Sequence, residues 1–227
     1  MSVKTIRAKS FDESDLGDLG DGAHSFVDCT FRGSVLEDAE WSGSSFESCD
    51  LSGVRFGDAD LSESSFTGCT GKGPVFGNTD LTDAAFERCD FGGPRFASIA
   101  AGGTAWRNSK LLNAVFTDLK GFGWSFSSCV LMYADLRGLG FRKATLHELD
   151  LTEADLRDAD FRGATFEMSK LIRADIRGAD FEGADLRGAD LGPLEDIQTL
   201  AALKGAMISQ RQARAVANAL GIVIVGD

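Results

Sequence analysis

The chain contains 227 residues and has a formal net charge of −12, from 35 acidic and 23 basic side chains. An acidic chain repels phosphates, so this charge argues against direct binding of nucleic acid. The sequence has 17 Phe but one Tyr, and 27 Gly but three Pro. This bias indicates repetition rather than a mixed globular fold.

Targeting signals are not apparent. The first residues, Met1-Ser2-Val3-Lys4, lack the apolar run of a signal peptide, and no apolar segment is long enough to span a membrane. We therefore expect a cytoplasmic protein that makes no membrane contact. The five cysteines, an odd number, fit reduced thiols in that compartment.

Residues 1–22 precede the regular pattern and are expected to form an N-terminal lead-in or cap. A strict period of five occupies residues 23–191. Every fifth residue from Phe26 to Leu191 is large and apolar except at Gly71, Ala101 and Gly121, with no insertion or deletion. Small residues form a second series, two positions before the first.

A period of five matches neither an α-helix nor a simple strand. A backbone that turns about 90° every five residues satisfies it, with two residues of each five pointing inward. Four such faces predict a coil of 20 residues. The cysteines test this number independently, because they are spaced by multiples of 20, at Cys29, Cys49, Cys69, Cys89 and Cys129.

The cysteines are interpreted as a column of small buried thiols. Their column contains no His, Asp or Glu, which argues against a metal site, and a reducing compartment argues against disulfides. A second column, Phe26, Phe46, Phe66, Phe86, Trp106, Phe126 and Phe166, predicts an aromatic stack in the core.

The segments Ala154-Asp155-Leu156-Arg157-Asp158 and Ala184-Asp185-Leu186-Arg187-Gly188 closely resemble the consensus of the pentapeptide-repeat family. The resemblance covers about residues 26–191. It implies an all-β solenoid, a right-handed quadrilateral β-helix with four repeats per coil. Since each coil packs only on its neighbours, both ends need caps.

Acidic side chains gather in the N-terminal half, where residues 1–100 hold 18 acids and 8 bases. The period of 20 places seven of them along one edge, in rows about 4.8 Å apart. We call this set the acidic stripe; it comprises Asp38, Glu40, Asp58, Asp60, Glu63, Asp80 and Asp83. It is either a solvated surface or an imitation of the phosphate rows of DNA.

Two other surface features follow from the period. Leu112, Met132 and Ile172 are outward in one column, with Tyr133 beside it, and form a candidate apolar contact patch. The segment 120–124 keeps the spacing but has Gly in the large position and Trp in the small one. A distorted coil is expected there, with Phe122 exposed.

Residues 192–227 are expected to form a C-terminal cap. Ser209 and Gln212 have the spacing of a capping box that opens a helix over about 209–220, and Gly221 stops it. The sequence after Gly221 predicts a short apolar strand. Residues 196–208 fit either a second short helix or an irregular last coil.

The cap either covers the end of the solenoid alone or also joins two copies. In the second case the candidate dimer contacts are Val216, Leu220, Ile222 and Ile224.

No residues form a catalytic, cofactor-binding or metal-binding constellation. His24 and His147 have no partner set, His24 being inward and His147 outward, and the glycines fall at bends of the repeat rather than in a phosphate loop. We therefore expect a non-enzymatic protein without a cofactor.

The acidic repeat together with the C-terminal helix resembles the MfpA, Qnr and AlbG group of pentapeptide-repeat proteins. This resemblance implies a homodimeric DNA mimic that binds DNA gyrase or topoisomerase IV and modulates it or protects it from quinolones or peptide toxins. Qnr-type members carry projecting loops, whereas the register here is unbroken. The alternative is a structural or scaffold protein that binds another partner through its surface.

Overall fold

The computed structural model describes residues 3–11, 16, 18–193 and 197–225, without the side chains of 197–199. The chain divides into two compact units, residues 1–130 and 131–227, which are described separately. Both are β-solenoids in which the chain passes along four faces in turn, five residues to a face. We number the faces so that residues 24–28 lie on the first and 39–43 on the fourth.

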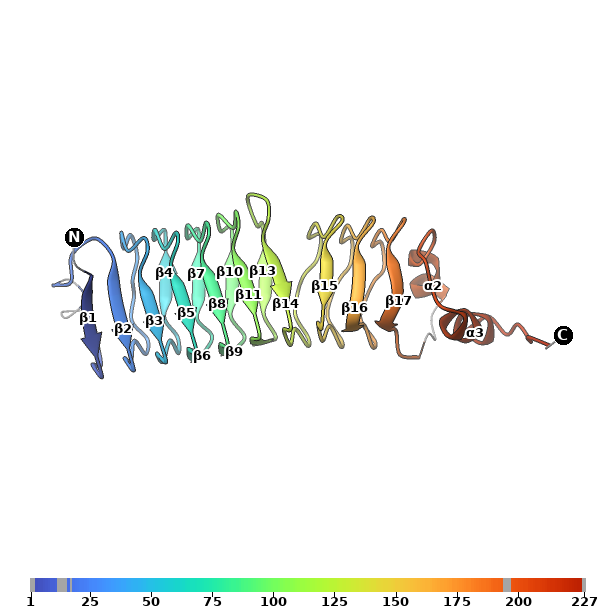
Figure 1. The fold of residues 1–227 in the computed structure, drawn as a ribbon, viewed down its shortest axis with the longest axis horizontal. Helices are drawn as coiled ribbons and strands as arrows, with labels where there is room; N and C mark the ends of the chain where they lie inside the picture. Colours follow the sequence, from blue (N-terminus) through green and yellow to red (C-terminus); the bar gives the residue numbers. More distant parts are fainter. Residues whose placement is uncertain (1–2, 12–15, 17, 194–196, 226–227) are drawn as a thin grey trace. The chain divides into compact units, whose positions relative to one another are not determined.

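The first unit stacks its coils by parallel strand pairing (Figure 1), and partners are 20 residues apart, as in Phe46 and Phe66. The strands of its first face are β1 (Lys4–Arg7), β2 (His24–Val27), β3 (Ser45–Glu47), β5 (Ser65–Thr67), β8 (Ala85–Glu87), β11 (Ala105–Arg107) and β14 (Ser125–Ser127). The second face has β6 (Thr70–Lys72), β9 (Asp90–Gly92) and β12 (Lys110–Leu112). The third has β4 (Arg55–Gly57), β7 (Val75–Gly77), β10 (Arg95–Ala97) and β13 (Val115–Thr117). The fourth face has isolated parallel bridges instead.

The regular coils begin earlier than the sequence predicted. In β1, Lys4 pairs with His24 and Ile6 with Phe26, so the segment expected as a lead-in already adds a strand to the first face. Phe11 is buried and stacks on Phe31 with ring centroids 4.6 Å apart. The rest of the expected lead-in lies partly outside the described residues.

Corners between faces require a left-handed backbone. The residue two positions after the large inward residue repeatedly has a positive φ, for example Asp58 at 53° and Asn78 at 54°. Non-glycine residues rarely adopt this region, and Asp and Asn tolerate it best. This preference explains why Gly, Asp, Asn and Ser recur at these positions.

The core consists of stacked rings, as the sequence predicted. Phe66 stacks on Phe46 and Phe86 with centroids 4.7 and 4.5 Å away and planes within 4° of parallel. A second stack on the third face runs through Phe76 and Phe96, 4.8 Å apart, and meets the first edge to face. Such contacts contribute about 0.5–1.5 kcal/mol per pair beyond burial.

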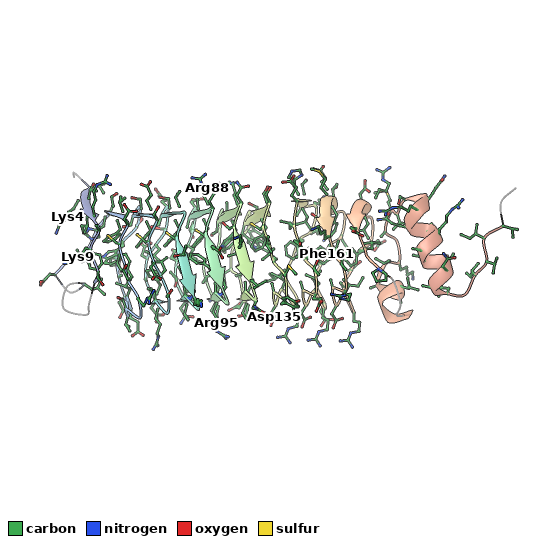
Figure 2. The ribbon with its side chains drawn as sticks, turned by 90° about the horizontal axis from the view of Figure 1, so that it is seen from below. Lys4, Lys9, Arg88, Arg95, Asp135 and Phe161 are labelled. Carbon is green, nitrogen blue, oxygen red and sulfur yellow. The ribbon has the colours of Figure 1, made fainter. Side chains whose placement is uncertain are left out.

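The second unit repeats this design with fewer strands. Its strands on the first face are β15 (Thr145–His147), β16 (Thr165–Lys170) and β17 (Asp185–Asp190), all parallel. The pairing of β16 with β17 shifts register after Thr165, although the sequence period does not change. Phe161 lies inside this unit (Figure 2) between Phe141 and Phe181, at 4.9 and 4.8 Å.

The C-terminal segment combines both predicted forms, a short helix and an irregular last coil. Helix α2 (Ile197–Ala202) precedes an isolated bridge from Met207 to Asp185, which extends the last coil. Helix α3 (Gln210–Ala219) follows with the expected capping box at Ser209 and Gln212. Gly221, at φ 72°, ends it as predicted.

The prediction of a short strand after Gly221 is wrong. Residues 222–225 are irregular and the apolar side chains are exposed. The backbone N–H of Ile222 donates to the carbonyl of Ala217, which ties it to the helix rather than to a sheet. A strand needs a neighbouring edge, and the local sequence pattern does not supply one.

Candidate interaction surfaces

The acidic stripe occupies the fourth face of the first unit and its two edges. Glu40, Asp60 and Asp80 are joined by parallel bridges and therefore lie above one another in successive coils. The carboxylates of two of them are oriented by local hydrogen bonds. Asp60 accepts from the backbone N–H of Ser62 at 2.9 Å, and Asp80 accepts from that of Thr82 at 2.8 Å.

The other four acids of the stripe stand at corners with positive φ. Asp38 and Asp58 precede the fourth face, with φ of 57° and 53°, and Glu63 and Asp83 follow it, both at 58°. All four are exposed. The structure thus brings together the seven residues that the sequence singled out and borders the face with carboxylates on both sides.

The acidic stripe is not neutralised within the described chain. None of its seven carboxylates forms an ion pair with a described base. Bases of this unit pair elsewhere, as Arg32 does with Asp50 at 2.7 Å and Arg55 with Glu37 at 3.3 Å. Like charges one coil apart repel each other by about 1 kcal/mol in water, so the stripe favours a cationic partner.

The second unit carries a contrasting arrangement of charge. Arg157 binds the carboxylate of Asp155 through two hydrogen bonds, at 2.8 and 2.6 Å, and its Nε lies 3.5 Å from Asp175 in the next coil. Arg137 repeats this pattern beside Asp135 (Figure 2 labels the latter). This ladder neutralises the consensus aspartates of the second unit.

The same pairing holds acids in their charged form. The hydrogen bond from Arg162 lowers the pKa of Asp160 to about 2, and Arg187 does the same for Asp185. A bidentate guanidinium stabilises the carboxylate and leaves it little capacity for another partner. The ladder is therefore a structural element rather than a second acidic binding surface.

The fourth face of the first unit loses its acids in its last coils, where Lys120 stands in the column of Asp60 and Asp80 and lies 3.9 Å from Asp118. Ala100 and Gly103 stand where the preceding coils have acids, and Phe122 follows with 94% of its surface exposed. Gly121 and Gly123 around it have φ of 95° and 82°, so the coil is distorted, as the sequence predicted. The sequence predicted the exposure of Phe122 but did not indicate a site there.

The candidate apolar contact patch is divided between the units. Leu112 belongs to the first unit, where it is partly exposed. In the second unit, Met132 and Ile172 are half-buried and Tyr133, at a corner with φ 58°, is 47% exposed. Met168 of the same unit is exposed as well. Within the second unit these residues form only a modest apolar surface.

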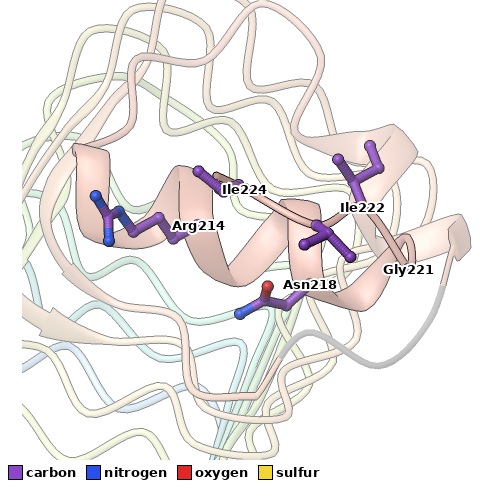
Figure 3. A pocket seen from close by; sticks show the side chains of 6 residues that line it. Arg214, Asn218, Gly221, Ile222 and Ile224 are labelled. Carbon is purple, nitrogen blue, oxygen red and sulfur yellow. The ribbon is translucent and has the colours of Figure 1, made fainter. Parts of the chain in front are cut away.

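The C-terminal segment offers a larger one. Val216 is half-buried, whereas Leu220, Ile222 and Ile224 are 48%, 54% and 47% exposed. An open hollow of about 390 Å³ lies between α3 and the residues after it (Figure 3); it is lined by Arg214, Asn218, Gly221, Ile222, Val223 and Ile224. It contains no acid or nucleophile suited to catalysis.

Side chains capable of chemistry are dispersed or used structurally. No group of three or more potential metal ligands occurs among the described residues. His24 packs against Trp41 with ring centroids 5.3 Å apart, and His147 lies 3.3 Å from Glu167 on the surface. No described helix is long and apolar enough to cross a bilayer.

The cysteines form the buried column that the sequence predicted, with all five thiols free. Each of three successive thiols donates to a carbonyl 23 residues earlier; Cys69 donates to Phe46, Cys89 to Phe66 and Cys129 to Trp106, all at 3.3 Å. Burial raises the pKa of Cys129 to about 11. These enclosed thiols are suited to packing rather than to nucleophilic chemistry.

Family models agree with this architecture. The model described as "Pentapeptide repeat region" matches residues 39–116, and "Pentapeptide repeats (8 copies)" matches 141–178 and 154–192. Together they cover more than half of the sequence. The chain belongs to the pentapeptide-repeat family. No match was found among curated proteins.

Solved structures of the family are similar to the chain. Full-length QnrB1, a plasmid-mediated fluoroquinolone resistance protein, matches with a TM-score of 0.75 and 23% identity over 88% of this chain and all of its own. A trypsin-treated variant of QnrB1 matches with 0.66 and 26%, over 99% of this chain and 98% of its own.

A third similar structure comes from a protein with another role. HetL, a pentapeptide-repeat protein involved in heterocyst differentiation regulation in the cyanobacterium Nostoc, matches with 0.53 and 18%, over 82% of this chain and 86% of its own. Since related folds serve different processes, the family fixes the architecture and the surface must decide the function.

Proposed function

We propose that this protein is a non-enzymatic DNA mimic that binds DNA gyrase or topoisomerase IV and modulates it or protects it from quinolones or peptide toxins. The observation that carries the proposal is the acidic stripe: seven carboxylates on one face and its two edges, without an ion pair to any described base. Enzymes that bind duplex DNA present rows of Lys and Arg side chains that are spaced to contact its phosphates. A rigid face of stacked carboxylates would compete with DNA for those basic side chains.

The backbone supports this role because it fixes the spacing of the charges. Glu40, Asp60 and Asp80 are held one coil apart by main-chain bridges, so their separation does not depend on flexible side chains alone. A preorganised ligand loses less conformational entropy on binding. Similarity to QnrB1, a fluoroquinolone resistance protein, adds support from a relative of known phenotype.

Association into a homodimer forms part of the proposal. The exposed side chains of Leu220, Ile222 and Ile224 give the C-terminal segment an apolar surface that a second copy could cover. An apolar surface at the end of a water-exposed chain is a typical contact between subunits. Two copies joined there would present two acidic stripes to one topoisomerase.

A purified-gyrase supercoiling assay, combined with binding measured at several salt concentrations, tests the function. The key variant, Asp58→Asn with Asp60→Asn and Asp80→Asn, keeps the acceptors for Ser62 and Thr82 but removes three charges. We expect it to lose inhibition or drug protection and to bind with a shallower salt dependence. Salt-insensitive binding, or no binding by the unaltered protein, would contradict the proposal.

A matched control removes three charges from the other faces of the same unit. Glu37→Gln, Glu47→Gln and Asp90→Asn change the net charge equally but leave the acidic stripe intact. Retained binding by the control together with lost binding by the stripe variant assigns the effect to position rather than to net charge.

The second candidate function is a scaffold for another partner. Tyr133, Met132 and Ile172 of the second unit favour it, because they are apolar side chains at outward positions. Replacing Tyr133 and Ile172 with Ser separates the two. Gyrase binding should be unaffected under the first proposal, and a partner of the scaffold should be lost under the second.

A further inference from the structure

Phe122 stands apart from the other phenylalanines in the solenoid. It is 94% exposed, whereas Phe66, Phe86 and Phe116 are fully buried. The equivalent positions in preceding coils hold Ser62, Thr82 and Gly102. An exposed aromatic ring in water contributes nothing to folding, so its position on the fourth face calls for another explanation.

The backbone around Phe122 is held by main-chain hydrogen bonds. Its carbonyl accepts from the N–H of Gly103 at 3.0 Å, and the N–H of Ala101 donates to the carbonyl of Lys120 at 2.7 Å. At Gly121 a Cβ atom would lie 2.9 Å from the backbone nitrogen of Gly102, so the chain packs closely there. The coil thus presents the ring from a fixed base.

The surroundings leave the ring accessible to a large partner. Gly102 lies between Thr82 and Phe122, since a Cβ atom placed on it would be 3.8 Å from Thr82 Cγ2 and 3.9 Å from the Phe122 carbonyl oxygen. The small residues Ala100, Gly102 and Gly103 form a level approach to the ring.

The ring is also continuous with the acidic stripe. The carboxylate of Asp83 leans over Gly103, where its Oδ1 occupies the space that a side chain would take. Gly103 is in turn hydrogen-bonded to Phe122. The last acid of the stripe and the backbone of Phe122 are therefore linked through one residue on one face.

We propose that Phe122 is the apolar anchor of the acidic stripe and inserts into an apolar pocket beside the basic side chains of the topoisomerase. This inference rests on the proposed function and adds to it a residue that determines affinity and specificity. Carboxylates accelerate encounter with a basic surface, and a buried aromatic ring slows dissociation. Aromatic residues are frequent among the few that dominate binding energy.

The anchor makes binding selective for a partner that has an apolar pocket as well as a basic groove. A stripe of carboxylates alone would suit any basic groove. A ring at its end requires an apolar pocket at a fixed distance from that groove, so it rejects basic surfaces that lack one.

Binding kinetics on immobilised gyrase at several salt concentrations test the inference. We expect Phe122→Ala to raise Kd about 10–100-fold, mainly through faster dissociation, with the association rate and the salt dependence unchanged. Phe122→Tyr should retain most of the affinity, because it keeps the ring. The stripe variant with Asn at 58, 60 and 80 should instead slow association.

Val35→Ala serves as the control, because Val35 is an exposed apolar residue on the third face of the same unit. It should bind like the unaltered protein, and melting curves should show that both alanine variants are folded. If Phe122→Ala binds normally while the stripe variant fails, or if Val35→Ala loses as much affinity, the inference is overturned and the proposed function stands. If the unaltered protein does not bind, both are overturned.

Discussion

The side-chain amide of Gln212 donates a hydrogen bond to the carbonyl of Leu186 over 2.7 Å. The same nitrogen donates to the carbonyl of Ala189 at 2.9 Å, while its oxygen accepts from the backbone N–H of Ser209 at 2.7 Å. The last full coil has no complete coil above it to supply N–H donors to these carbonyls. One buried residue therefore caps the start of helix α3 and also closes the end of the solenoid.

We expect Gln212→Leu to destabilise the second unit by about 2–4 kcal/mol, because it strands two buried carbonyls and breaks the capping box. Urea denaturation followed by circular dichroism measures this. Gln210→Ala is the control, because Gln210 is exposed two residues earlier in the same helix. It should change the stability little. Equal stability of the two variants would show that the cap does not hold the last coil.

The guanidinium of Arg162 makes the stability of the fold depend on pH. Because Arg162 lowers the pKa of Asp160 to about 2, below the value of about 3.9 expected in the unfolded chain, the pair stabilises the fold above pH 4. This contribution is lost as the pH falls through the folded value near 2. We expect Arg162→Gln to lower the urea midpoint at pH 7 and to have a smaller effect at pH 2.5.

The control for this experiment is Lys204→Gln, which removes an exposed charge of the same sign from the second unit. It should show no comparable loss at pH 7. A difference between Arg162→Gln and the unaltered protein that is constant from pH 7 to pH 2.5 would rule out the ionic explanation.

Phe86 is enclosed in the aromatic stack, with Phe66 at 4.5 Å on one side and Trp106 at 5.7 Å on the other. Phe86→Ala is expected to cost about 3–5 kcal/mol, because each coil rests only on its neighbours and cannot easily refill the space. Phe86→Leu should cost clearly less. Thermal or urea unfolding of the first unit checks the order, and equal losses would indicate that volume does not determine stability here.

The cysteine column gives a chemical test of the fold. All five thiols are buried and free. Since a buried sulfur is out of reach of a reagent in solution, a disulfide reagent at neutral pH should modify almost none of them in native protein and all five after denaturation. Rapid reaction of several thiols in folded protein would contradict the buried column.

The sequence predicts the inward columns well because they depend only on a period. Phe66, Cys69 and Phe76 lie where a 20-residue coil puts them, and the acidic stripe follows from the same arithmetic. The first coil could have been found in the same way, since Ile6 and Phe11 stand 20 residues before Phe26 and Phe31.

Features that depend on distant partners could not be read from the period. The second role of Gln212 requires carbonyls 23 and 26 residues away, which no local pattern indicates. The apolar run from Ile222 has the composition of a strand, but no described edge receives it. The exposure of Phe122 follows from its outward position and was predicted, but the contact of Asp83 with Gly103 beside it could not be read from the period.

The exposed C-terminal segment predicts the oligomeric state. Ile222→Asp with Ile224→Asp places two charges on side chains that are about half exposed in one chain, so a monomer should tolerate them. In a dimer they would be buried without partners, at a cost large enough to dissociate it. We expect sedimentation equilibrium to show a dimer for the unaltered protein and a monomer for this variant, with α3 intact because Ser209 and Gln212 are unchanged. Met168→Asp, which alters another exposed apolar residue of the second unit, should remain dimeric. A monomeric unaltered protein at all concentrations would exclude the C-terminal contact, and the topoisomerase would then meet one acidic stripe at a time.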